Sequence, residues 1–490
     1  IDMPEFTPIE VTDQITREVG ALLRERDNVL NYQSWVGQTG VIDFNGLLKG
    51  AGNKKGPFVA EVRVNLTDKK TRDMSSIDLV AQLRPAMEKI QQRYPGSVIQ
   101  LAEDLPGPPL RATVLAEIYG KDPEKLREIS AKVSRVFKET YGVVEVHDSE
   151  VADVPQFRVI VDKEKAALSG VSVAQVVQAL RQMVSGTEMG RLHIASEKKI
   201  VPIRLHIPYQ YQIDPTLLSS IYLTNRQGQR IPLSELTRVV NDIQDRPILH
   251  KDYERVTFVG AELSDTTPVY AVMDIDQRLD NLSLGEGEVL TTGNLQLQSV
   301  TPDTIDGYQL LWDGEIRLTL DVFRDMLGAL GIALVFIYLL LVGYYASFKI
   351  PLIAMSAIPL GLIGVFPGHW IVGEPFTSTS MIGVIALAGV VVRNSLLIID
   401  FVVDYMKKGM SAHEAVREAG AVRLRPILLT ALAIVLGSAV MLSDPVFGGL
   451  AISLIFGTIV STALTLVVVP MLLYSMLTRQ SLHTGSTGED

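Results

Sequence analysis

The sequence predicts a multi-pass membrane protein, in which an α-helical transmembrane bundle is joined to a large α+β part outside the membrane. Five long apolar segments all fall after residue 325 of the 490-residue chain. The mean hydropathy is +0.24 although 20% of the residues are charged, and these five segments account for the apolar excess. The earlier residues contain no comparable run and alternate between strand-like and helix-like patterns, as α+β domains do.

Each apolar segment is long enough to cross a bilayer as a helix. The five predicted spans are 326–346, 350–372, 379–403, 426–442 and 447–477. A short amphipathic stretch at 411–420 is expected to form a separate helix on the membrane surface. The connection at 404–425 is rich in Lys and Arg, so the positive-inside rule places it in the cytoplasm. Counting back through three spans places the α+β part outside the cytoplasm.

The α+β part shows the same pattern twice. Elements in the order β-α-β-β-α-β, typical of a ferredoxin-like fold, end at a Pro-rich stretch, and the pattern then begins again. The second copy is interrupted by an insertion with its own strands and helix, and strand 288–292 is expected to complete it. The predicted domains are module 1 (1–109), module 2 (110–154 with 255–310), the inserted domain (155–254), the transmembrane domain (311–480) and a tail (481–490).

The start of the sequence offers no means of moving the α+β part across the membrane. Ile1 is not preceded by the charged and apolar regions of a signal peptide or by a spanning helix. We therefore expect these residues to be the C-terminal part of a longer polypeptide or one chain of a split protein. The chain has no Cys, which excludes disulfides and thiolate metal sites.

Arg393 is the residue of the predicted spans whose charge most needs an explanation. It lies about ten residues, roughly 15 Å, from the nearer end of its span. A charge at that depth costs about 3 kcal/mol or more, and Arg cannot release its proton. It can therefore serve only as a fixed counter-charge to a group that titrates. The alternative is a buried charge that locks helix packing, held by backbone carbonyls or by the Asn394 amide.

No carboxylate in the five spans lies at the depth of Arg393. Asp400 is two turns further along the same side of the helix, and its role stays open between a structural pair and a participant in proton transfer. An acidic partner for Arg393 is therefore expected from helices outside this chain. Taken by itself, Arg423 is typical of the basic residues that anchor a span at the cytoplasmic side of the membrane.

Three separated motifs resemble the C-terminal half of RND (resistance-nodulation-division) efflux transporters. The motifs are GVIALAGVVVRNSLLIID, AVREAGAVRLRPILLTALAIVLG and PQFRVIVDKEKAALSGVSVAQVVQAL. Drug-exporting members usually have Lys at the position of Arg393, followed by Asn as Asn394 is here. The resemblance implies that Arg393 faces two Asp residues of the N-terminal half, and that Arg423 and Thr430 belong to the same proton relay.

The resemblance also implies a substrate path between two porter modules, with the insertion as a docking domain. Loop 37–56 matches a loop that lines the drug pocket, so Phe44, Leu47 and Leu48 are the candidate substrate contacts; an ordinary hairpin loop is the alternative. Heavy-metal exporters of the family typically have Glu at the position of Arg393 and clustered Met ligands. The methionines of module 1, Met3, Met74 and Met87, are instead expected in the core or on the surface.

The leading hypothesis is half of a proton-driven exporter of hydrophobic or amphiphilic compounds. It would be a secondary transporter in the bacterial inner membrane, with its large N-terminal part periplasmic, and not an enzyme. No cofactor, metal site or nucleic acid is expected. The partners implied are the missing N-terminal half with its acidic relay residues, two further copies in a homotrimer, a periplasmic adaptor, an outer-membrane channel and the lipid bilayer. The alternatives are a non-transporting membrane module, such as a sensor or protein-secretion accessory, and a metal-ion exporter of the same superfamily.

Overall fold

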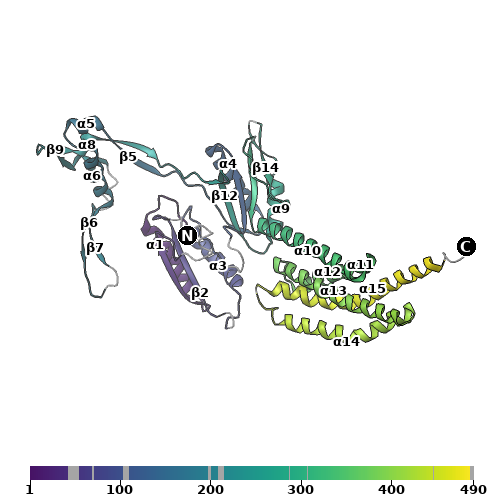
Figure 1. Cartoon of the computed structure of the whole chain (residues 1–490). Coiled ribbons are helices and arrows are strands. Elements are labelled where there is room, and N and C mark those ends of the chain that lie inside the picture. The colour runs from purple at the N-terminus through teal and green to yellow at the C-terminus, as the bar shows by residue number, and fades with distance from the viewer. Residues whose placement is uncertain are drawn as a thin grey trace. The chain divides into compact units, whose positions relative to one another are not determined.

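The computed structural model divides the chain into two compact units, Ile1–Glu150 with Leu249–Asp490, and Val151–Ile248. It describes residues 1–41, 55–68, 71–102, 110–196, 200–207, 215–285, 287–305, 307–444 and 446–485. Figure 1 shows the strands of the first unit and, further along the chain, a bundle of long helices.

Module 1 has the ferredoxin-like connectivity that the sequence predicts, but its outer strands are short. Its elements are α1 (Ile9–Arg24), β1 (Val29–Val36), β2 (Ala60–Leu66) and α3 (Ser76–Gln91). The first and last predicted strands are reduced to single bridges, in which Asp2 pairs with Val59 on one side and Val98 on the other. The two helices bury an apolar core that includes Ile15 and Leu83.

Module 2 is built on a mixed sheet in the order β11-β12-β3-β15-β14-β13, with β4 also paired to β12. Its elements are β3 (Val114–Tyr119), α4 (Pro123–Glu139), β4 (Val143–Asp148), β11 (His250–Lys251), β12 (Glu254–Leu263), α9 (Pro268–Leu279), β13 (Leu282–Gly285), β14 (Glu288–Gly293) and β15 (Tyr308–Gly314). The strand expected at 288–292 exists as β14, but the strand beside β3 is β15. Helices α4 and α9 bury one face of this sheet, around Phe137 and the fully buried Trp312.

A cluster of charged side chains links three strands on the opposite face of this sheet. Lys251 Nζ lies 2.6 Å from Glu117 Oε1 and 2.9 Å from Asp313 Oδ2, and the Tyr119 hydroxyl donates to Glu117 Oε2 at 2.8 Å. Burial raises the pKa of Glu117, although the hydrogen bond from Lys251 opposes the shift. Burial also disfavours the charge on Asp313, but Lys251 outweighs this effect and lowers the pKa of Asp313. Three strands are thereby joined through one ammonium group.

Replacing Lys251 with Met should lower the free energy of unfolding by about 2 kcal/mol at neutral pH, because two acids then face each other with no cation. The loss should be smaller than for a wholly buried pair, because the Lys251 side chain is 39% exposed. The loss should also shrink as the pH falls. Lys251 opposes the rise in the pKa of Glu117 and lowers the pKa of Asp313, so without Lys251 both acids bind protons more tightly in the folded state, and protonation removes their repulsion. Thermal unfolding at pH 7 and pH 5 measures both effects. An unchanged midpoint, equal to that of the exposed-residue control Lys121→Met, would contradict this account.

The inserted unit has its own small core. Its elements are β5 (Pro155–Val161), α5 (Lys163–Leu168), α6 (Val173–Ser185), β6 (Thr187–Leu192), β7 (Val201–Leu205), the 3₁₀ helix η2 (Pro215–Ser219), β8 (Tyr222–Thr224), β9 (Arg230–Pro232), α8 (Leu233–Leu236) and β10 (Thr237–Ile243). Strand β5, where the chain enters the unit, pairs with β10, where it leaves. Val176, Leu233 and Leu236 are fully or almost fully buried between the short helices.

Five helices are long and apolar enough to cross a membrane among the residues that the structure describes. They are α10 (Glu315–Tyr345), α11 and α12 together (Lys349–Met355 and Ala357–Val372), α13 (Ser378–Lys407), α14 (Ala412–Ala439) and α15 (Gly448–Gly485). Helix α10 starts directly after β15. Helix α14 runs through Pro426, so residues expected as a surface helix form its first turns; the Ser411 hydroxyl caps it by accepting from the Glu414 amide.

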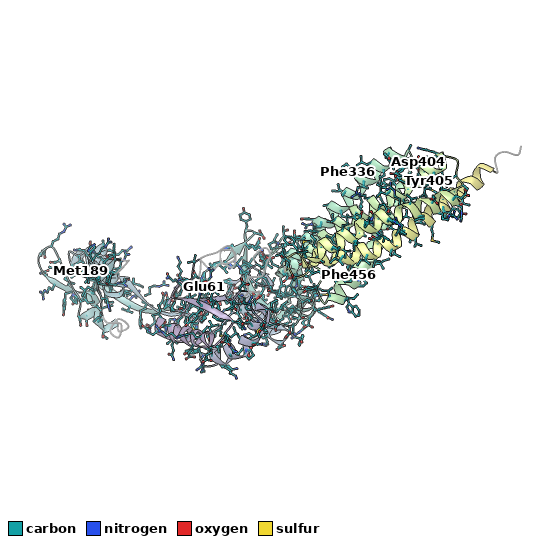
Figure 2. All side chains as sticks on the ribbon, turned by 90° about the horizontal axis from the view of Figure 1, so that it is seen from below. Glu61, Met189, Phe336, Asp404, Tyr405 and Phe456 are labelled. Atoms are coloured by element: carbon teal, nitrogen blue, oxygen red, sulfur yellow. The ribbon has the colours of Figure 1, made fainter. Side chains whose placement is uncertain are left out.

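Helix α15 packs most closely within the bundle. It contacts α12, α13 and α14. Toward α12 and α13 it presents a stripe of small residues that lets the helix backbones approach, namely Gly449, Ser453, Gly457 and Ser461. Ser453 is fully buried and Ser461 is 2% exposed. In Figure 2, Phe456 labels one side of this bundle, and Asp404 with Tyr405 lie at the end nearer the C-terminus of α15.

Candidate coupling site in the membrane

Arg393 lies near the middle of the 30-residue helix α13, and its side chain is exposed in this chain. It forms no hydrogen bond or ion pair with any residue that the structure describes. The next residue, Asn394, points to the other side of the helix and is only 4% exposed. The guanidinium is thus neither neutralised by the five helices nor held by the Asn394 amide.

Arg393 belongs to an open face of α13, which we define by the exposed residues Ile382, Ala386, Gly389 and Arg393. Their spacing of three and four residues places them on one side of the helix. The other side, which includes Leu387, is buried in the bundle core. A Cβ added to Gly389 would meet no atom within 4 Å. Small residues next to the charge leave room for another helix to approach this face closely.

Asp400 is paired, but not with Arg393. The hydroxyl of Tyr345, the last residue of α10, donates to Asp400 Oδ1 at 2.5 Å. This contact joins α10 to α13 two turns beyond Arg393. Sequence reasoning missed Tyr345 because a Tyr at the end of a span is typical of the membrane interface.

Arg423 and Thr430, on α14, are held by other neighbours. The Arg423 guanidinium carbon lies 3.7 Å from the centre of the Phe401 ring, an arrangement typical of a cation–π contact. Arg423 Nε is buried without a hydrogen-bond partner among the described residues. The Thr430 hydroxyl donates to the Pro426 carbonyl at 2.9 Å, within its own helix.

The structure therefore does not join the five predicted relay residues to one another. Among the residues that it describes, no hydrogen bond or ion pair links any two of Arg393, Asn394, Asp400, Arg423 and Thr430. Instead, it shows that Arg393 is unpaired on the open face of α13. It also shows that Tyr345 of α10 and Arg423 of α14 each contact a residue of α13.

The predicted substrate contacts Phe44, Leu47 and Leu48 lie outside the described residues. Two of the module 1 methionines are part of the hydrophobic core, with Met3 6% and Met87 3% exposed, and Met74 packs against that core. Within the described ranges, no group of three or more His, Cys, Asp or Glu side chains is placed to hold a metal ion.

Comparison with known proteins gives matches along nearly the whole chain. A family model described as the AcrB/AcrD/AcrF family matches residues 2–478. The cobalt-zinc-cadmium resistance protein CzcA of Cupriavidus metallidurans is 28% identical over 371 residues, which are 74% of this chain and 33% of CzcA. The multidrug resistance protein MdtC of Proteus mirabilis is 23% identical over 373 residues, which are 74% of this chain and 33% of MdtC.

The fold also matches a solved structure. The crystal structure of a heavy metal efflux pump superposes with a TM-score of 0.74 and 22% identity, covering 97% of this chain and 46% of the pump's chain. Matched residues thus cover about a third of the curated relatives' length and less than half of the solved pump chain.

Proposed function

Because this chain belongs to the AcrB/AcrD/AcrF family, we propose that it forms part of a proton-driven RND-type exporter. The observation that carries the proposal is the position of Arg393, mid-span on the open face of α13 and unpaired among the described residues. A permanent charge in the hydrocarbon region requires a partner, and the five helices offer none at that depth. Carboxylates from helices outside this chain are the partners that we propose.

The proposed coupling follows from the chemistry of this pair. Arg stays protonated, so only the facing carboxylates change charge. When they are ionised, the planar guanidinium can hold two of them at once; when they are protonated, this attraction is lost. The facing helix can then move along the open face, where Ala386 and Gly389 offer little obstruction. Proton binding and helix movement are thereby linked.

We propose hydrophobic or amphiphilic compounds as the substrates. The support is that Met3 and Met87 are core residues of module 1. In addition, the family resemblance implies that Arg393 stands where metal exporters typically have Glu. A metal ion is the second candidate, because CzcA and the solved heavy metal pump are among the similar proteins. A non-transporting module is the least supported alternative.

The partners and location that we propose are those of the family. They are an N-terminal half that supplies the acidic residues, a homotrimer, a periplasmic adaptor and an outer-membrane channel, with residues before α10 on the periplasmic side of the inner membrane. The Lys and Arg residues at the end of α13, in the short turn after it and in the first half of α14 support this orientation.

Transport by the intact protein in proteoliposomes with an imposed pH gradient tests the proposal. We expect a cationic amphiphilic dye to be moved against its gradient and to stimulate proton flux, with Co²⁺ and Zn²⁺ giving no stimulation. Stimulation by the metal ions alone would overturn the substrate class. If neither dye nor metal is moved, the export function itself is wrong.

A further inference from the structure

Helix α10 is fastened to module 2 at its first turn. Arg317 is 5% exposed and its Nη1 donates to the backbone carbonyls of Asn294 (3.0 Å) and Gln296 (2.8 Å), while Nη2 donates to that of Leu297 (3.1 Å). An ion pair of 2.5 Å with Asp321, one turn along α10, orients the guanidinium. The helix start therefore cannot move without the segment that follows β14.

No flexible linker separates α10 from the sheet. Strand β15 ends at Gly314 and α10 begins at Glu315. Gly314 has φ = +76°, and a Cβ there would lie 2.8 Å from the Thr113 carbonyl oxygen and 2.9 Å from that of Ala112. The left-handed backbone is thus packed against the neighbouring segment, which makes the junction a rigid corner.

Between its two ends, α10 has little packing within this chain. Val335 is 58% and Phe336 is 62% exposed, and the position of Phe336 on the outside of the bundle is visible in Figure 2. At its far end, Tyr345 donates to Asp400 on α13. Helix α10 is therefore a rod held at one end by Arg317 and at the other by Tyr345.

We propose that the Tyr345–Asp400 hydrogen bond is the joint through which movement of α13 reaches α10 and, through β15, module 2. This inference rests on the proposed function, in which α13 responds to protonation near Arg393. Asp400 is then a positioning residue whose acceptor oxygen matters, and not a proton carrier. The joint is specific, because removing one hydroxyl would leave both helices intact while removing the one hydrogen bond that joins them among the described residues.

Tyr345→Phe tests this joint, with Tyr344→Phe as the matched control. Tyr344 is 72% exposed and its ring contacts that of Tyr345 edge-on, a contact that both variants keep. In proteoliposomes, Tyr345→Phe should lower the dye exported per proton about tenfold, since the hydrogen bond between α10 and α13 is lost. Proton flux without dye should persist, and Tyr344→Phe should match wild type.

Asp400 variants separate the hydrogen bond from the charge. Asp400→Asn keeps an acceptor oxygen and should retain most of the coupling, whereas Asp400→Ala should behave like Tyr345→Phe. Loss of coupling in Asp400→Asn with normal coupling in Tyr345→Phe would make Asp400 a proton carrier and overturn the inference. If Tyr345→Phe does not accumulate, the two Asp400 variants test the inference. Coupling in Asp400→Asn but not in Asp400→Ala supports it, and equal loss in both contradicts it.

Arg393→Ala in the same assay distinguishes the two proposals. If it transports normally, the coupling through Arg393 in the proposed function is wrong. If it is inactive while Tyr345→Phe and Tyr344→Phe both equal wild type, only the joint is wrong.

Discussion

Arg393→Ala is expected to abolish export while leaving the protein assembled in the membrane. The substitution removes the only charge at mid-depth of α13, so protonation of the carboxylates that we propose to face it would no longer change an ion pair. A fall of at least about a hundredfold in dye export corresponds to losing the roughly 3 kcal/mol of a buried pair. Dye efflux in cells, normalised to the amount of protein in the membrane, measures the effect.

Two variants serve as controls for Arg393→Ala. Arg393→Lys keeps the charge and should retain export, although Lys cannot hold two carboxylates in the bidentate manner of Arg. Arg425→Ala removes an exposed charge at the middle of α14 and should export normally. Normal dye resistance in Arg393→Ala, at wild-type protein levels, would remove the relay role from Arg393.

Gly364→Ala is expected to prevent correct packing of the bundle. A Cβ at Gly364 on α12 would collide with the Phe456 carbonyl oxygen on α15 and lie 2.7 Å from Val460 Cβ. The carbonyl belongs to the backbone, so relief requires the two helices to separate. Overpacking of this kind costs about 3 kcal/mol. The amount of folded protein recovered in detergent should fall severalfold, with a lower unfolding temperature.

Gly437→Ala is the matched control, since a Cβ there meets no atom within 4 Å and Ala favours the helix. It should leave the recovery of folded protein unchanged. If Gly364→Ala is equally stable, α12 and α15 do not pack closely at this glycine.

The spanning helices could be predicted because apolar runs of this length are rare outside membrane-spanning segments. Their ends were less predictable. Helix α10 begins at Glu315, eleven residues before the predicted span. Its first turns are polar and carry Arg317, which binds backbone carbonyls of module 2, so hydropathy did not reveal them. The residues before Pro426 are charged on one side and were expected at the membrane surface, but good helix formers continue α14 without a break.

Strand existence was easier to predict than strand pairing. The repeat of the module 1 pattern predicted a strand at 288–292, and β14 occupies those positions. Its neighbour could not be predicted, because the order of elements along the chain does not say which strands pair. The strand beside β3 is β15, which carries the core residue Trp312.

Arg393 stood out in the sequence because a lone charge in an apolar segment is costly wherever the chain folds. The contact of Tyr345 with Asp400 was not predictable, since it joins residues on separate helices and each alone suits a helix end. The open face of α13 also required the structure, because its apolar residues resemble those that are buried.

A cryo-EM structure of the intact protein at neutral pH tests the central claim most directly. We predict that the Arg393 guanidinium will lie within hydrogen-bond distance of at least one carboxylate from a helix outside this chain, with that helix covering Ala386 and Gly389. A guanidinium that reaches lipid headgroups, or that pairs only with residues of α10 to α15, would contradict the proposed coupling.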